Sequence, residues 1–153
     1  MKPISLIRAG VLLALFFMPL GMVEGAPSYN PKSGDPCTIN MRAVVPISLT
    51  AGGQLITGKS GKTTYICNLH LVTATAQNIA LVEGTGTTCA TNTAGMAGGA
   101  TAATGWNFAI NQSLALGGNG MGWILATATA GDNVCLLLSA TGQTSGAIAY
   151  VQQ

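Results

Sequence analysis

The sequence predicts an all-β protein folded as an antiparallel β-sandwich, and three observations support this fold class. Apolar residues make up 48% of the 153 residues but aromatic residues only 5%, and 21 glycines interrupt the chain. Short runs rich in β-branched residues alternate between apolar and polar positions, with turn residues between them. No stretch after residue 26 repeats its apolar residues at the helical period of about 3.6. We expect a jelly-roll-like sandwich, with an immunoglobulin-like sandwich as the alternative.

The clearest predicted strand covers residues 63–72 (TTYICNLHLV). Its alternation predicts one face that carries Tyr65, Cys67, Leu69 and Leu71, and an opposite face that carries Ile66, Asn68 and His70. In residues 77–83 the same pattern directs Ile79 and Leu81 inward. Pro46 predicts an edge position or a bulge for the strand that contains it. The other strands are expected at residues 42–49, 54–57, 77–83, 106–110, 113–116, 121–127, 133–139 and 146–151.

Two glycine-rich segments lie between the predicted strands. Residues 84–105 are too rich in Gly and Thr for a stable helix and too long for a simple turn. We interpret them as an ordered excursion held by Cys89 that extends across a neighbouring subunit, with disorder as the alternative. The GKSGK sequence at residues 58–62 lacks the GxxxxGK[ST] pattern of a phosphate loop, so it predicts a charged hairpin turn.

The first 25 residues have the composition of a secretory signal peptide. A start with two bases is followed by an apolar run and then by small residues, with cleavage expected after Gly25. Pro19 and the shortness of the run argue against a retained membrane anchor. We therefore expect an exported product, periplasmic or extracellular, with no membrane association after cleavage. Residues 26–40 are expected to form an extended N-terminal arm, and residues 41–153 a single β-sandwich domain.

The four cysteines follow the predicted signal peptide, and an even number in an exported chain predicts two disulfides. Three pairings are possible. We favour Cys37–Cys67, which would attach the N-terminal arm to a strand, and Cys89–Cys135, which would attach the glycine-rich segment to a late strand. The cysteines are too far apart in the sequence, and histidine too scarce, for a zinc site.

Catalytic residues are not expected. After residue 25 the carboxylates are limited to Asp35, Glu83 and Asp132, and His70 is the single histidine, with no nucleophile motif beside it. We therefore predict that the chain is not an enzyme and has no metal or cofactor. The bases form no cluster, so nucleic acid is not an expected partner. Trp106 and Trp123 could stack on sugars, but a core or interface role is favoured for both.

Several motifs resemble one group of proteins. They are GK-x-x-Y-I-C from Gly61, V-x-G-T-G-x-x-C from Val82, D-N-V-C-L from Asp132 and the closing Y-V-Q. This pattern resembles small, mostly uncharacterised virion-associated proteins of tailed bacteriophages and prophages, over roughly residues 40–153.

The resemblance implies a structural or accessory protein that forms a homo-oligomer, with a trimer favoured, and that decorates a virion or binds a cell surface. Its partners would be virion proteins or cell-surface glycans. One alternative is a bacterial exported surface protein, an adhesin or filament subunit, in which strands at the chain ends pair by strand addition. Another is a small carbohydrate-binding module.

Overall fold

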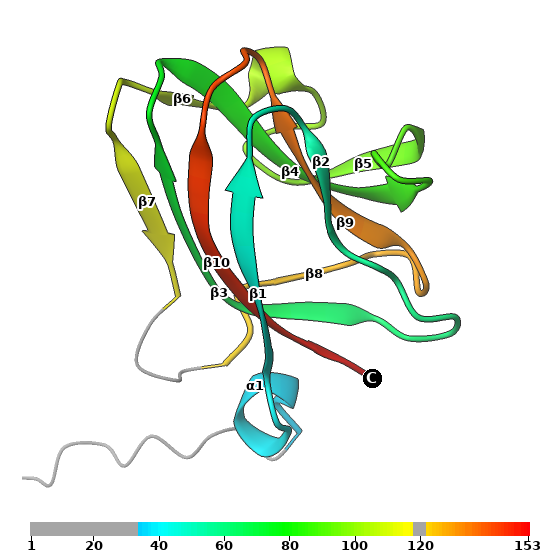
Figure 1. The fold of residues 1–153 in the computed structure, drawn as a ribbon. Coiled ribbons are helices and arrows are strands. Elements are labelled where there is room, and N and C mark those ends of the chain that lie inside the picture. The colour runs from blue at the N-terminus through cyan, green and yellow to red at the C-terminus, as the bar shows by residue number, and fades with distance from the viewer. Residues whose placement is uncertain (1–33, 118–121) are drawn as a thin grey trace, which may run out of the picture.

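Two antiparallel β-sheets pack face to face in the computed structural model, which describes residues 34–117 and 122–153 (Figure 1). The antiparallel β-sandwich predicted from the sequence is confirmed, while its jelly-roll-like and immunoglobulin-like forms stay alternative predictions. Sheet A contains, in spatial order, β1 (Ala43–Leu49), β10 (Thr144–Gln152), β3 (Thr64–Thr73) and β7 (Ser113–Leu116). Sheet B contains β2 (Gly53–Ile56), β9 (Asn133–Leu138), β4 (Gln77–Thr85) and β5 (Thr91–Ala97).

Each sheet has a further short strand beside its longest member. In sheet A, β8 (Leu125–Ala126) pairs with the first part of β3, and β7 pairs with the later part. In sheet B, β6 (Trp106–Phe108) pairs with the start of β4, and β5 pairs with its end. The other edge of sheet A is β1, so Pro46 lies in an edge strand, as predicted.

The core lies between the sheets and consists mostly of aliphatic side chains, with the aromatic ring of Phe108 among them. Ile79 and Leu81 of β4 are fully buried there, as the sequence predicted. On sheet A, Leu69 is paired in register with Ile148, and both side chains belong to the same cluster. The remaining buried members of this cluster are Ile47, Leu55, Ile56, Ile66, Leu71, Phe108, Val134 and Leu136.

The predicted alternation along β3 is wrong in its first half. Ile66 is fully buried in the core, while Tyr65 packs on the outside with Cys67. The cause is a β-bulge, because Ala149 pairs with Asn68 but the next residue pairs with Ile66, so Cys67 has no partner on β10. An extra residue in one strand reverses which side chains face the core and which face outward on one side of the bulge.

Residues 84–105 form ordered structure against their own sheet, so the disorder alternative is wrong. They contain β5, which the sequence did not predict, and a 3₁₀ turn η1 (Ala102–Thr104) that contacts β4. Gly/Thr-rich sequence gives no clear strand pattern, because its side chains carry little contrast between an apolar and a polar face.

Two local expectations need correction. The GKSGK loop is not a hairpin, because the strands it connects, β2 and β3, belong to different sheets. The N-terminal arm is not extended throughout, because Pro36–Ile39 form a single helical turn, α1. Asp35 caps that turn by accepting a hydrogen bond from the Cys37 N–H at 2.8 Å, and Pro36 suits the first helical position. The predicted signal peptide and residues 26–33 lie outside the described residues.

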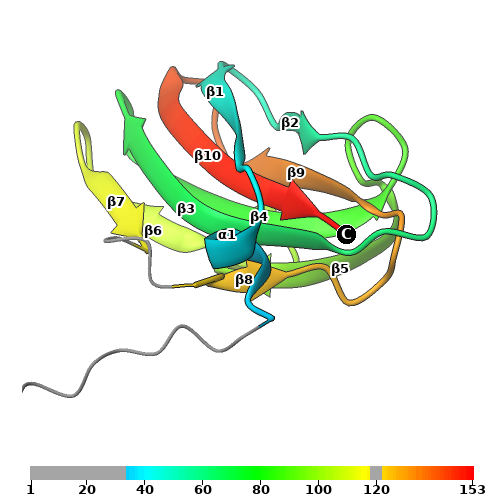
Figure 2. The same ribbon diagram turned by 90° about the horizontal axis from the view of Figure 1, so that it is seen from below.

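Both α1 and the end of β10 lie at one end of the sandwich (Figures 1 and 2). There, α1 contacts β3 and β10. The loop from β2 to β3 reaches the same end, because the backbones of Thr63 and Gln153 exchange hydrogen bonds of 2.9 and 3.2 Å.

Candidate functional site

The four cysteines form the two disulfides that the sequence analysis favoured, Cys37–Cys67 and Cys89–Cys135, with Cα separations of 5.6 and 6.0 Å. All four side chains are buried. The first bond attaches α1 to the outside of sheet A, where it packs with Val151. The second attaches the glycine-rich segment to β9 on the outside of sheet B. Two buried disulfides indicate a non-reducing compartment.

The carboxylates that the sequence analysis considered have local structural contacts. Glu83 is buried, and its Oε2 accepts a hydrogen bond from the Ala128 N–H at 2.7 Å. Asp132 is also buried, in the turn before β9, and Asp35 caps α1. His70 is exposed on β3, between Ala147 and a β7 residue in register. Across residues 34–117 and 122–153, no group of three or more His, Cys, Asp or Glu side chains is arranged to hold a metal ion.

The two tryptophans lie in different parts of the fold and differ in burial. Trp106, in β6, is half-buried and packs against the main core. Trp123 precedes β8 and is 48% exposed, with its ring 5.8 Å from that of Tyr65 in an edge-to-face arrangement. The structure therefore does not bring the two indoles together, and a sugar-stacking role could rest only on Trp123.

The outer face of sheet A forms a surface with few charges. The strand registers define three rows of side chains that point away from the core. The rows are Val44–Ala149–Asn68, Pro46–Ala147–His70–Ala115 and Ser48–Ser145–Val72–Ser113. These positions hold no lysine, arginine or carboxylate, and Val44 is 64% exposed. We call these three rows the outer face of sheet A.

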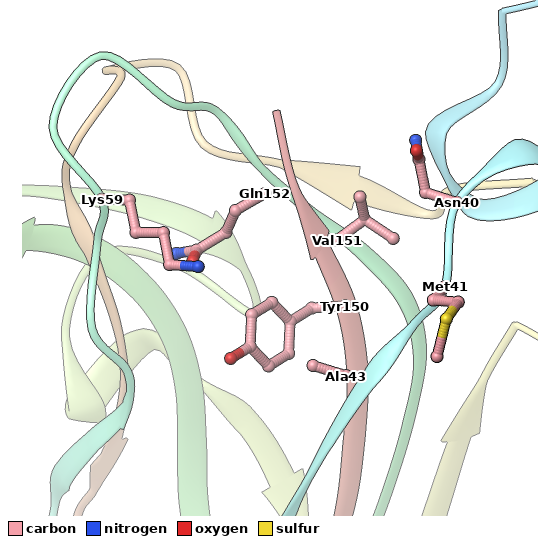
Figure 3. Close-up of a pocket in the computed structure, with 7 residues that line it drawn as sticks. All are labelled: Asn40, Met41, Ala43, Lys59, Tyr150, Val151 and Gln152. Atoms are coloured by element: carbon pink, nitrogen blue, oxygen red, sulfur yellow. The ribbon is translucent and has the colours of Figure 1, made fainter.

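A polar hollow of about 280 Å³ lies at the end of the sandwich that carries α1 and the C-terminal part of β10 (Figure 3). Lys59 of the β2–β3 loop lines it together with Tyr150 and Gln152 of β10, and all three extend to the same side of that strand (Figure 3). Asn40 and Met41, in the α1–β1 connection, line it from the other side of β10 (Figure 3). Of the described residues that line it, Lys59 is the charged one.

A second hollow, of about 500 Å³, lies on the outside of sheet B beside the Cys89–Cys135 bond. Its lining consists of threonine, alanine, cysteine and leucine side chains, including Leu137, Ala90 and Thr101. The described part of this lining presents methyl groups and hydroxyls but no charged or amide side chain, so it has fewer means of orienting a ligand than the hollow at Lys59.

Lys59, Tyr150 and Gln152 are not among the site residues predicted from the sequence. Lys59 lies about 90 positions before the other two in the chain, and the three meet because the backbones of Thr63 and Gln153 pair. The register that aligns the β2–β3 loop with the end of β10 has no local sequence signal.

Comparisons with protein-family models, with curated proteins and with solved structures find no match to this chain. No helix within residues 34–117 and 122–153 has both the length and the apolar character that crossing a membrane requires.

Proposed function

We propose that this chain is an exported, non-enzymatic structural protein that assembles with copies of itself, as an accessory protein of a phage-derived particle or at a cell surface. The observation that carries the proposal is the outer face of sheet A. Its central row consists of Pro46, Ala147, His70 and Ala115, so small side chains surround a single titratable group.

Such a face suits contact with a second copy for two physical reasons. Charged residues are depleted in the centres of protein interfaces, because each buried charge must be desolvated. Alanine, proline and serine also lose little side-chain entropy when they are covered, so the contact costs little ordering. Val44, at 64% exposure, adds an apolar side chain to this surface.

Export is supported by the two buried disulfides and by the N-terminal sequence pattern. The phage context is supported by the Cys-containing motifs, such as the segment from Gly61 to Cys67, that resemble virion-associated proteins. That resemblance makes a trimer the expected form.

The fold offers few free strand edges for strand addition, on which the filament alternative depends. The last strand, β10, pairs with β1 on one side and β3 on the other. Only β1 is an edge strand at the chain ends, and Pro46 in its centre lacks an N–H to donate to an added strand. Assembly through a sheet face therefore has the stronger structural basis.

The experiment is the molar mass of the secreted, oxidised protein in solution, measured by light scattering after size exclusion over micromolar to submillimolar concentrations. We expect a multimer, with three copies favoured. Val44→Glu and Ala115→Glu change exposed positions on the outer face of sheet A and should each reduce the mass toward that of a monomer. Ala51→Glu, at an exposed position in the turn between β1 and β2, is the matched control and should leave the mass unchanged.

Two outcomes would count against the proposal. A wild-type protein that stays monomeric at the highest concentration contradicts self-assembly. A multimer that survives Val44→Glu and Ala115→Glu but dissociates with Ala51→Glu places the interface elsewhere. For the particle context, mass spectrometry of purified particles from the source of this gene should detect the protein, and its absence would contradict that part.

A further inference from the structure

The hollow at the end of the sandwich contains polar groups that the fold holds in place. The Gln152 Nε2 donates to the Thr57 carbonyl oxygen at 2.8 Å and to the Thr64 hydroxyl at 3.1 Å. The Asn40 Nδ2 donates to the Gln153 side-chain oxygen at 2.9 Å and to the Pro36 carbonyl oxygen at 3.2 Å. A carbonyl oxygen can only accept, so each amide must direct its nitrogen to the protein, and this leaves the amide oxygens to accept from another molecule.

The donors of the hollow are Lys59 and Tyr150. Among the residues that the structure describes, neither the Lys59 ammonium nor the Tyr150 hydroxyl has a hydrogen-bond partner. Within residues 34–117 and 122–153, no carboxylate side chain lines the hollow beside Lys59. Gln153 is not part of the lining either, and its backbone oxygen accepts from the Thr63 N–H at 2.9 Å. The ammonium is therefore available to pair with an anionic ligand.

The apolar part of the lining lies around the Tyr150 ring. The Tyr150 ring lies beside Ala43 of β1, and Met41, which is 97% exposed, lies in the connection that leads into this strand (Figure 3). Aromatic and thioether surfaces make favourable contacts with C–H groups of a ligand. The hollow thus combines a cation, a phenol, amide acceptors and an apolar patch within about 280 Å³.

We propose that this hollow binds an acidic sugar, that is, a uronate-type residue of a glycan. The carboxylate of such a sugar would accept from Lys59 and Tyr150, one of its hydroxyls would donate to the amide oxygen of Gln152, and its C–H face would contact the Tyr150 ring. The volume suits one sugar residue rather than a longer segment. Nothing in this inference depends on self-assembly, and the site should work in a monomer.

The experiment is a titration of the oxidised full chain with glucuronate at low salt, followed by protein-observed NMR. Glucose, which has the same ring without the carboxylate, is the matched ligand control. We expect saturable shifts in the millimolar range for Lys59, Tyr150 and Gln152, at least fivefold weaker binding of glucose, and weaker glucuronate binding at high salt, because the ion pair is screened.

Matched variants test the roles of the two donors. Lys59→Gln should weaken glucuronate binding about fivefold and leave glucose binding unchanged, because it removes the charge but keeps a donor. Lys62→Gln, in the same loop but outside the hollow, should bind as the wild type does. Tyr150→Phe keeps the ring and should weaken glucuronate binding two- to threefold.

Four outcomes would overturn the proposal. The first is equal affinity for glucose and glucuronate, and the second is equal loss from Lys59→Gln and Lys62→Gln. The third is a set of shifts that surround Trp123 and Tyr65 instead of Tyr150, which would make the exposed indole the sugar platform. Absence of any saturable shift with glucuronate also contradicts it. Because Ala115→Glu is remote from the hollow, it should bind glucuronate normally, so loss of assembly and loss of binding can be distinguished.

Discussion

The side-chain Nε2 of Gln77 in sheet B donates a hydrogen bond of 2.9 Å to the Thr144 hydroxyl in sheet A. The same nitrogen donates to the Thr73 hydroxyl at the end of β3, at 2.7 Å. All three residues are buried, with exposures of 5% or less. One amide thus joins the start of β4 to two strands of the opposite sheet, at the end of the sandwich away from α1 (Figure 1).

Replacement of Gln77 by alanine is expected to lower the free energy of unfolding by about 2–4 kcal/mol. The variant loses two buried hydrogen bonds, and the Thr144 hydroxyl loses the Gln77 amide as its partner. The shorter side chain also leaves a cavity. Urea unfolding of the oxidised protein measures the change. Gln143→Ala is the control: that glutamine also bonds Ser48 and Ser145 through its amide, but it is exposed, so the loss should stay below about 1 kcal/mol. Equal losses in the two variants would contradict a special role of the buried amide.

Gly98 and Gly86 give a matched test of the order in residues 84–105. Both have positive φ, 77° and 83°, which disfavours any residue with a β-carbon. At Gly98 that atom would also lie 2.9 Å from the Ile79 carbonyl oxygen and 2.9 Å from the Trp106 indole, whereas nothing lies within 4 Å at Gly86. Gly86→Ala should cost about 1 kcal/mol and Gly98→Ala about 2–4 kcal/mol, because the second change adds a steric clash to the strain. Denaturant unfolding checks this, and equal costs would mean that residues after β5 do not pack on β4.

Most of the fold follows from patterns that are local in the sequence. The strand containing Ile79 and Leu81 was predicted because alternation over several residues directs one set of side chains inward. Pro46 predicted an edge strand or a bulge, because proline removes a ladder hydrogen bond, and β1 is an edge strand. The disulfide pairing followed from the expected places of the arm and of the glycine-rich segment, and the structure contains the favoured pairs.

What the sequence did not predict depends on contacts between distant residues. The bulge at Cys67 is defined by the register against Ala149, and nothing near Cys67 in the sequence marks it. β5 was missed because its residues have weak strand preference and are held by pairing with β4 and by the nearby Cys89–Cys135 bond. The hollow was missed because Lys59 and Tyr150 converge only after the β2–β3 loop is fixed to the end of β10.

Removal of either disulfide should destabilise the fold, with the larger effect from the longer loop. The bonds close loops with separations of 30 and 46 residues. Chain-entropy arguments give about 3.7 kcal/mol for Cys37–Cys67 and about 4 kcal/mol for Cys89–Cys135. Alanine pairs at each bond, compared by thermal and urea unfolding, measure the losses.

Loss of each disulfide should lower the hydrogen-exchange protection of different strands. Loss of Cys89–Cys135 should release hydrogen-exchange protection in β5 while β3 and β10 keep theirs, because that bond lies on the outside of sheet B. If the Cys37–Cys67 variant instead loses protection in β5, the assignment of each bond to one sheet would be wrong.

The two tryptophans should differ in stability and in fluorescence. Trp106→Ala removes a side chain that packs against the main core and is expected to cost about 3 kcal/mol. Trp123→Ala removes an exposed ring whose described aromatic contact is Tyr65, so the loss should be about 0.5–1.5 kcal/mol.

In the single-tryptophan variants, acrylamide should quench Trp123 more strongly than Trp106, since Trp123 is 48% exposed. A self-assembly contact on the outer face of sheet A that reaches Tyr65 would also cover Trp123. Acrylamide quenching of Trp123 should then fall as the protein concentration rises. Val44→Glu should abolish this dependence on protein concentration.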